Sequence, residues 1–331
     1  MSFASDAKIE VLNQNIDNDC CSIAFLSALI KSAGQLNIKR TGISVEIYTE
    51  IKPVYDKIKL IIEQYYGKEC NLEMIDETNI SKVPRYKITL PYEITDQLLK
   101  DLGVMSINEE GLLAIENGIS NFVITDDCCK KSYIKGAFIG CATSNIVLKS
   151  YDNLSKNNSG YHLEFVFNFE KLAHDFVELL SNFDISAKIT IRKNLPIVYI
   201  KEYQLICDTL ALVGAYKSVL ALQNEAAIRE LRNNVNRQTN CMNANIGRMV
   251  KASVKQLNAI QVIQDNVGLE SLDEGLMELC LLRIANPDES LDNLRKLLST
   301  PLTKSGINHR FNKIIKYADE IIQSKFKINI L

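Results

Sequence analysis

Residues 19–34, DCCSIAFLSALIKSAG, return 108 positions later as residues 127–142, DCCKKSYIKGAFIGCA. Aromatic, branched aliphatic and small residues coincide between the two stretches, so the chain contains an internal repeat. Each copy is predicted to be a buried helix with small residues four positions apart. Because such a stripe lets two backbones approach closely, we expect the two helices to pack against each other. The small residues are Ala24, Ala28 and Ser32 in the first copy, and Ser132, Gly136 and Gly140 in the second.

The segments after the two copies repeat one order of predicted elements. Hydrophobic periodicity indicates two strands, a helix, two more strands and a closing helix in each half. Residues 1–215 are therefore expected to form an α+β domain, a duplicated αββαββα unit with halves at about 1–110 and 120–215. The predicted elements cover 36–38, 43–47, 52–66, 71–75, 85–90 and a helix ending at Gly103, then 146–148, 161–167, a helix to Phe183, 185–192, 197–200 and a helix ending near Gly214.

This doubled unit resembles the LAGLIDADG homing endonucleases, whose two motif helices pack at a pseudo-two-fold axis. In those nucleases the residue before the final motif glycine is an acid, because a carboxylate must hold a divalent metal ion against the scissile phosphate. Ala33 and Cys141 stand at the equivalent positions here, and Lys31 and Ile139 replace the preceding acid of the motif. None of these side chains binds magnesium as a carboxylate does. We therefore expect no nuclease activity and no catalytic residue.

The nine cysteines are odd in number, are spread over the chain and include no C-x-x-C pair. This usage favours reduced thiols over a disulfide framework or a zinc knuckle. Adjacent cysteines point in different directions, so the pairs Cys20 and Cys21, and Cys128 and Cys129, would each chelate poorly alone. A four-thiolate site requires both pairs to converge at the two-fold axis. A buried structural role is the favoured interpretation, and neither a metal ion nor a cofactor is expected.

Positive charge is concentrated in the last third of the chain. The formal net charge of −2 divides into −6 for residues 1–215 and +4 for the remainder. The windows 229–255 and 293–318 each hold six basic side chains, against one acid in the first and none in the second. Such windows are candidate sites for a polyanion, and solvated helix faces are the ordinary alternative.

Residues 216–268 are predicted to form a basic helical connector of two consecutive helices. One face of the first helix carries arginine and asparagine. Arginine suits phosphates and guanine edges and carboxamides suit adenine edges, so this face is a candidate DNA contact, with contacts to a neighbouring domain as the alternative. The second helix, from about residue 244 to 267, should bury Ile246, Val250 and Ile260. The candidate DNA-binding residues are Arg229, Arg232, Asn233, Asn236, Arg237 and Asn240.

Residues 269–331 are predicted to form an all-α helix-turn-helix domain of three helices. The first ends before Pro287, Ser290 caps the second, and residues 299–303 break the chain before the third. The third helix should turn an apolar face inward and a polar, basic face outward, as a DNA recognition helix does. A protein-interaction bundle is the alternative. The candidate DNA-binding residues are Lys304, Ser305, Asn308, His309, Arg310, Asn312 and Lys313.

Three features occur together in this chain: paired motif helices that begin with Asp-Cys-Cys and lack catalytic acids, the Arg/Asn helix, and the segment KSGINHR at residues 304–310. With these features the chain closely resembles the bacterial WhiA family over nearly its full length. Proteins of that family pair an inactive homing-endonuclease-like domain with a C-terminal helix-turn-helix and regulate sporulation or cell division. The resemblance implies non-enzymatic DNA binding, in transcription regulation or on the chromosome.

Double-stranded DNA is the expected partner, and a regulatory protein bound to the first domain is a second candidate. The sequence has no run of eighteen apolar residues and no secretory signal at its start. We therefore expect no contact with a membrane and a cytoplasmic, nucleoid-associated location. Two alternatives stay open. One is a metal-dependent nuclease in which other acids, such as Asp127 or Glu164, hold the metal ion, and the other is an adaptor that binds proteins and not DNA.

Overall fold

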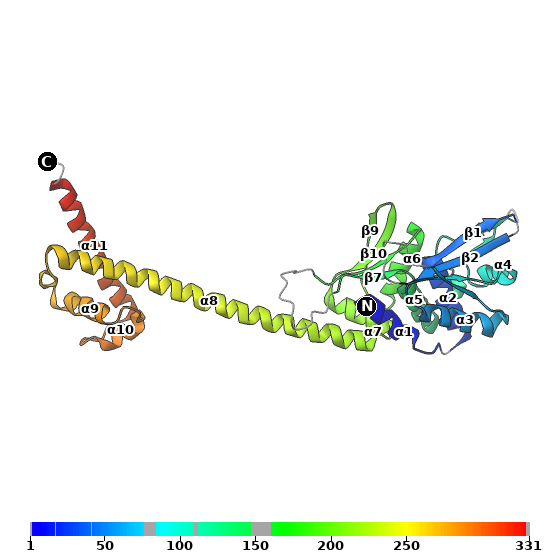
Figure 1. Cartoon of the computed structure of the whole chain (residues 1–331), viewed down its shortest axis with the longest axis horizontal. Helices are drawn as coiled ribbons and strands as arrows, with labels where there is room; N and C mark the ends of the chain where they lie inside the picture. The colour runs from blue at the N-terminus through cyan, green and yellow to red at the C-terminus, as the bar shows by residue number, and fades with distance from the viewer. Residues whose placement is uncertain are drawn as a thin grey trace. The chain divides into compact units, whose positions relative to one another are not determined.

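The computed structural model divides into two compact units, residues 1–228 and 229–331. The first unit combines helices with antiparallel sheets, and the second is helical (Figure 1). The structure describes residues 2–16, 18–40, 42–75, 84–108, 112–146 and 160–328, with side chains as far as residue 324.

The first half of the first unit places a four-stranded antiparallel sheet beside the motif helix α2 (Asp19–Ala33). Its strand order is β1-β2-β4-β3. Alternate residues of β2 are buried, namely Ile43, Val45 and Ile47, as the period of a half-buried strand requires. The elements are β1 (Gly34–Lys39), β2 (Gly42–Thr49), α3 (Pro53–Tyr66), β3 (Asn71–Ile75), β4 (Arg85–Thr89) and α4 (Tyr92–Asp101).

The second half repeats this order around α5 (Asp127–Cys141), and its sheet has the matching strand order β7-β8-β10-β9. The predicted duplication is confirmed. The strand expected at 146–148 begins earlier, at Ala142, because the chain passes directly from α5 into extended backbone; residues 147 and 148 lie outside the described residues. The elements are β7 (Ala142–Ser144), β8 (Leu163–Val166), α6 (Glu170–Ser181), β9 (Lys188–Arg192), β10 (Leu195–Ile200) and α7 (Tyr203–Val213).

The two motif helices pack directly on each other, as the small-residue stripes predicted. A Cβ atom added at Gly136 would lie 2.2 Å from the carbonyl oxygen of Phe25, and one at Gly140 would lie 2.0 Å from the hydroxyl of Ser32. Glycine is therefore required at position 136, where the added atom would meet backbone, whereas at position 140 it would meet a serine side chain. This contact joins the two halves into a single hydrophobic core.

Helix α1 and the segment that links the two halves were not anticipated from the sequence. Helix α1 (Phe3–Leu12) buries its apolar residues in the shared core. A hairpin of β5 (Met105–Ile107) and β6 (Leu113–Ile115), followed by a short 3₁₀ turn, η1 (Asn121–Val123), links the two halves. The Glu10 carboxylate of α1 also accepts hydrogen bonds from the backbone N–H groups of Lys217 and Ser218, at the start of the long helix α8 (Tyr216–Asn266).

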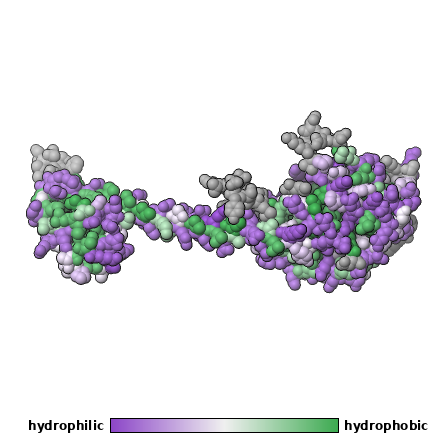
Figure 2. Space-filling view, turned by 60° about the horizontal axis from the view of Figure 1, so that its bottom comes forward, coloured by the Kyte–Doolittle hydropathy of each residue, from purple (hydrophilic) through white to green (hydrophobic). Residues whose placement is uncertain are grey.

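A single helix, α8 (Tyr216–Asn266), replaces the two consecutive helices predicted for the connector. The predicted burial of Ile246 and Val250 is wrong, since they are 54% and 49% exposed. No described element packs on that part of the helix, and Figure 2 shows apolar and polar surface alternating along it. Ile260 is buried as predicted. Neither α8 nor any other described helix is apolar enough over sufficient length to cross a bilayer.

The second unit packs three helices on the last turns of α8. Its core combines Ile260 and Ile263 of α8 with side chains from all three helices. Ser290 caps the middle helix, as predicted, by accepting a hydrogen bond from the Asn293 backbone N–H at 3.2 Å. The predicted helix-turn-helix architecture is confirmed. The helices are α9 (Glu274–Ala285), α10 (Leu291–Leu297) and α11 (Lys304–Ile328), with the 3₁₀ turn η2 (Leu269–Ser271) before them.

Candidate nucleic-acid interface

Helix α11 buries one side and presents a polar, basic side at its start. Ile307, Phe311 and Ile314 are fully buried, so the period of 3.6 residues turns the intervening positions outward. No acid occurs between residues 304 and 318, and a polyanion meets no repulsion from this stretch. Six predicted DNA-binding side chains are exposed together here: Lys304, Ser305, Asn308, His309, Asn312 and Lys313.

Arg310, the seventh predicted residue of α11, is half-buried. Its Nη1 donates a hydrogen bond to the carbonyl oxygen of Gly275 at 3.2 Å and ties α11 to the start of α9. A guanidinium has five N–H donors, so the same side chain retains donors for a phosphate. Arg310 therefore positions the helix as well as offering charge.

Arg283 of α9 is a structural arginine that sequence reasoning missed. It is 2% exposed, and its Nη1 donates to the carbonyl oxygens of Asn286, Pro287 and Glu289 at 3.3, 3.3 and 2.7 Å. Its guanidinium also lies 5.4 Å from the ring centroid of Phe311. These contacts fix the α9–α10 turn and join it to Phe311 of α11. The signal was its spacing of four residues from the inward-facing Leu279.

The turn before α11 is held by side chains of α9 and α10. Glu278 accepts hydrogen bonds from the backbone N–H and the hydroxyl of Ser299 at 2.7 and 3.0 Å. Lys304 pairs with Asp292 at 3.2 Å, with both side chains well exposed. An exposed ion pair is weak in water, so Asp292 does not hold Lys304 tightly.

The Arg/Asn face predicted on the connector lies along the exposed middle of α8. Arg229, at its start, is half-buried. The whole circumference of the helix is exposed from residue 231 to 240, so this face differs from the rest in composition and not in exposure. Its other predicted residues, all exposed, are Arg232, Asn233, Asn236, Arg237 and Asn240.

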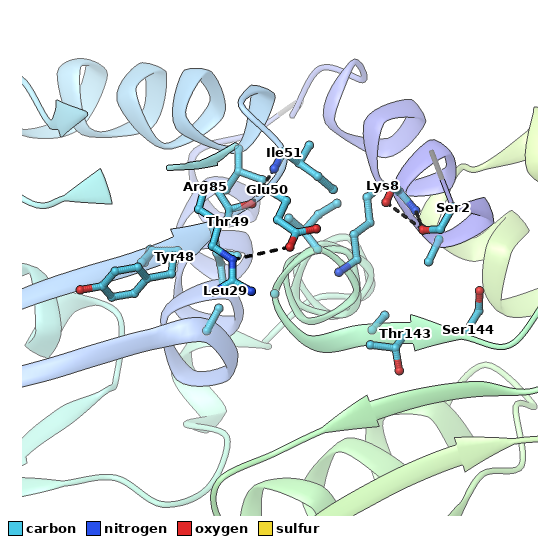
Figure 3. A pocket seen from close by; sticks show the side chains of 18 of the residues that line it. Ser2, Lys8, Leu29, Tyr48, Thr49, Glu50, Ile51, Arg85, Thr143 and Ser144 are labelled. Atoms are coloured by element: carbon cyan, nitrogen blue, oxygen red, sulfur yellow. Dashed lines mark hydrogen bonds and ion pairs between the residues drawn. The ribbon is translucent and has the colours of Figure 1, made fainter. Parts of the chain in front are cut away.

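A pocket lies at the ends of the motif helices, where a homing endonuclease would carry its acids. Its volume is about 730 Å³, and it is lined by the ends of α2 and α5 and by strands of both sheets. Lys8 of α1 points into it (Figure 3). Glu50 is the one acid among the described lining residues, and its carboxylate pairs with Arg85 at 3.7 Å.

The electrostatics at this end of the helices oppose metal binding. Burial raises the pKa of the Cys141 thiol to about 12, and the same effect lowers the pKa of the nearby Lys8. The thiol donates a hydrogen bond to the carbonyl oxygen of Ala137 at 3.3 Å. A protonated thiol beside a lysine does not attract a divalent cation, so this motif is degenerate in charge as well as in sequence.

Lys31, which replaces the earlier motif acid, has a structural role. It is 8% exposed and donates hydrogen bonds to the carbonyl oxygens of Glu116, at 3.2 Å, and of Gly118. Burial lowers its pKa to about 8, although the carboxylates of Glu116 and Asp175 act in the opposite direction. The lysine anchors the segment that links the two halves.

The two substitute acids considered from the sequence do not join this pocket. Asp127 begins α5, and Cys141 ends it, so roughly 20 Å of helix separates them. Glu164 lies on β8, where its carboxylate contacts Nε2 of His162 at 2.5 Å and Arg192 at 3.3 Å. Neither acid lies among the described residues that line the pocket.

The two cysteine pairs converge at the opposite end of the motif helices. The four Sγ atoms of Cys20, Cys21, Cys128 and Cys129 all lie within 4.8 Å of one another. From the sequence, we favoured a buried structural role for these cysteines and noted that a four-thiolate site requires both pairs to converge. In the structure the two pairs do converge.

Three family models match successive parts of the chain. They describe the WhiA N-terminal LAGLIDADG-like domain over residues 19–105, the WhiA LAGLIDADG-like domain over 130–232, and the WhiA C-terminal HTH domain over 235–318. The first two cover most of the duplicated unit and the start of α8, and the third covers the remainder of α8, α9, α10 and the first part of α11.

Curated relatives and a solved structure match over nearly the full length. Relatives named "Probable cell division protein WhiA" are 37% identical in Clostridium acetobutylicum and 34% identical in Clostridium beijerinckii, covering 97% and 98% of this chain and 98% and 100% of theirs. The structure of full-length DUF199/WhiA from Thermatoga maritima is 24% identical, covers 97% of this chain and 99% of that chain, and has a TM-score of 0.56, which supports the fold. The extent and identity of these matches show that the chain belongs to the WhiA family.

Proposed function

We propose that this chain is a double-stranded DNA-binding protein without enzymatic activity and that α11 is its recognition helix. The observation that carries the proposal is the exposed polar and basic face of α11, fixed from behind by a packed three-helix core. The major groove admits one α-helix, and helix-turn-helix proteins present the start of their recognition helix to it.

The side chains of this face divide between bases and phosphates. Lys304, Asn308 and His309 lie at the start of α11 and are the candidates for base edges, since a carboxamide pairs with adenine and a lysine with guanine. Arg310 and Lys313 are directed to phosphates. Further polar and electrostatic contacts come from Ser305 and Asn312 on α11 and from Arg229, Arg232, Asn233, Asn236, Arg237 and Asn240 on α8.

The direct experiment is an anisotropy titration of the full chain into a labelled duplex. The double variant Lys304→Glu, Lys313→Glu should bind at least about tenfold more weakly, because it replaces two positive charges on the exposed face of α11 with negative charges that the polyanionic duplex repels. Lys188→Glu, at an exposed lysine of β9 in the first unit, is the matched control and should leave the affinity unchanged. Equal affinity of the native chain and the double variant for the duplex would show that α11 is not the recognition helix.

The nuclease alternative is tested on supercoiled plasmid with Mg²⁺ or Mn²⁺. The degenerate motif ends and the lysine in the pocket support an intact plasmid at saturating protein. Nicking that a chelator abolishes, and that Glu164→Gln removes, would establish the alternative. An adaptor without DNA affinity would instead show no duplex binding at low salt.

We further infer a role in cell division, as a transcription regulator or a chromosome-associated factor. The name of the relatives supports it. The first domain, with its net charge of −6 over residues 1–215, is the candidate surface for a regulatory protein. A fluorescent fusion should co-localise with the nucleoid, and the double variant of α11 should lose that pattern.

A further inference from the structure

Four thiols from the two halves of the first unit gather at one point. They occupy the second and third positions of α2 and of α5, so each half contributes two. All four Sγ atoms lie within 4.8 Å of one another, and those of Cys128 and Cys129 are 4.0 Å apart. The repeat therefore delivers to one place a ligand set that neither vicinal pair could supply alone.

We propose that Cys20, Cys21, Cys128 and Cys129 bind one Zn²⁺ ion in a closed structural site that joins the two halves. A tetrahedral zinc site has Zn–S bonds of about 2.3 Å, which puts its sulfur atoms about 3.8 Å apart. The widest separation of 4.8 Å exceeds this edge by about 1 Å. Small rotations of the side chains close that difference without moving the helices.

The mutual closeness of all four sulfurs distinguishes a mononuclear site from its rivals. Thiolates on separate irons of an iron–sulfur cluster lie farther apart, because the cluster stands between them. Two disulfides would need only two close pairs, with S–S bonds of about 2.05 Å. Here each sulfur is near the other three, as the corners of one tetrahedron are.

The four sulfurs lie in the first turns of two helices. A zinc tetrathiolate carries a net charge of −2, which the positive dipole ends of the two helix N-termini favour and the Asp19 and Asp127 carboxylates of the same turns oppose. Neither N-cap residue, Asn18 or Asp126, caps its helix with a side-chain hydrogen bond. Cys21 and Cys129 are buried while Cys20 and Cys128 are exposed, so the site has a dry side and an entry path.

The location assigns the ion a structural role. Cys20 and Ala33 are thirteen residues apart on α2, which is roughly 20 Å of helix, so the ion lies at the opposite end from the pocket. Four thiolates also leave no open coordination position for a substrate or water. The ion would instead hold the N-terminal ends of α2 and α5 together. Because each helix belongs to one half, metal binding would couple the folding of the two halves.

The test is the metal content of the full chain purified without chelator, measured by inductively coupled plasma mass spectrometry. We expect about one zinc per chain, and less than about a tenth of an equivalent in the double variant Cys20→Ser, Cys128→Ser. Both substituted thiols are exposed, so serine is tolerated by the core. Cys241→Ser, at an exposed cysteine of α8, is the control and should keep the full equivalent.

A second measurement does not depend on any variant. The demetallated chain titrated with Co²⁺ should develop thiolate-to-cobalt charge-transfer bands and the visible bands of tetrahedral cobalt, saturating at about one equivalent, with a lower melting temperature before the metal is added. Zinc content in the native chain as low as in the double variant, absence of the tetrahedral cobalt spectrum, or disulfides among the four cysteines by mass spectrometry would each overturn the proposal.

Discussion

At the residue level, Gly136 and Gly140 lie where the two motif helices of the first unit pack most closely. Their Cα atoms face the Phe25 carbonyl and the Ser32 hydroxyl across the helix pair. Gly136→Ala should lower the free energy of unfolding by about 1–3 kcal/mol, because the added methyl meets backbone that cannot give way. Urea unfolding measures this change.

Gly247 provides the matched control for that substitution. It lies within α8 and a Cβ atom there would meet nothing within 4 Å. Gly247→Ala should therefore stabilise its helix by about 0.5–1 kcal/mol through helix propensity. Equal effects at Gly136 and Gly247 would contradict close packing of the motif helices.

The pKa of Lys31 gives stability a defined dependence on pH. Because burial lowers this pKa from 10.5 to about 8, the unfolded chain holds the proton more tightly than the folded chain. Between these two values the folded lysine is neutral and the unfolded one is charged, so the contribution of Lys31 to stability rises with pH. Below pH 8 both are charged, and the cost of the buried charge is fully present.

Comparison with a variant isolates this effect from the other titrating groups. The free energy of unfolding of the native chain, relative to that of Lys31→Met, should increase between pH 7 and pH 10. A constant difference between the native chain and Lys31→Met over this range would show that the Lys31 ammonium is not buried.

At the scale of elements, Arg283 joins the helices that present the recognition face. Its removal takes one donor from the carbonyl oxygens of Asn286, Pro287 and Glu289 in the α9–α10 turn, of which Pro287 keeps the hydrogen bond from the Ser253 hydroxyl. Arg283→Met should destabilise the second unit by about 2–3 kcal/mol in calorimetry, and Arg283→Lys should be intermediate, because lysine keeps the charge but loses the fork. Full stability of the Met variant would refute a structural role for this arginine.

Asn308 is the best candidate on α11 for direct base readout. On a duplex obtained by selection from random sequences, Asn308→Ala should weaken the binding free energy by about 1–3 kcal/mol. It should also reduce discrimination between bases at one position of the duplex. Asn258→Ala, at an exposed asparagine of α8, should change neither quantity. Uniform weakening across all sequences would instead assign Asn308 to the phosphate backbone.

Elements with a strong local signal could be predicted from the sequence. The stripes of small residues predicted the helix pair, and the inward residues Ile307, Phe311 and Ile314 predicted the orientation of α11. The continuity of α8 was missed, because asparagine-rich helix has weak propensity and Ile246 and Val250 suggested a packing partner that no described element supplies. Arg283 was missed because burial of an arginine depends on carbonyl groups that only the folded turn assembles.

Over the whole molecule, the proposed function gives separate roles to the duplicated unit and to the three terminal helices. The duplicated unit has the paired motif helices of a LAGLIDADG-like domain but places Ala33, the buried Cys141 and Lys8 at the pocket end, so the motif is degenerate there. The convergence of four thiols at the other end could not be deduced from spacing, because two adjacent cysteines reveal no partner until the two-fold axis is built.

The salt dependence of duplex binding by the full chain decides whether α11 contacts the phosphate backbone of DNA. If α11 binds the phosphate backbone, log K should fall steeply and linearly with log salt, and Lys304→Ala combined with Lys313→Ala should flatten the slope by at least about one unit, the share of the phosphate contact assigned to Lys313. Lys188→Ala should leave the slope unchanged. A flat salt dependence of the native chain, or an unaltered slope in the double variant, would contradict the assignment of α11 as the DNA-binding element.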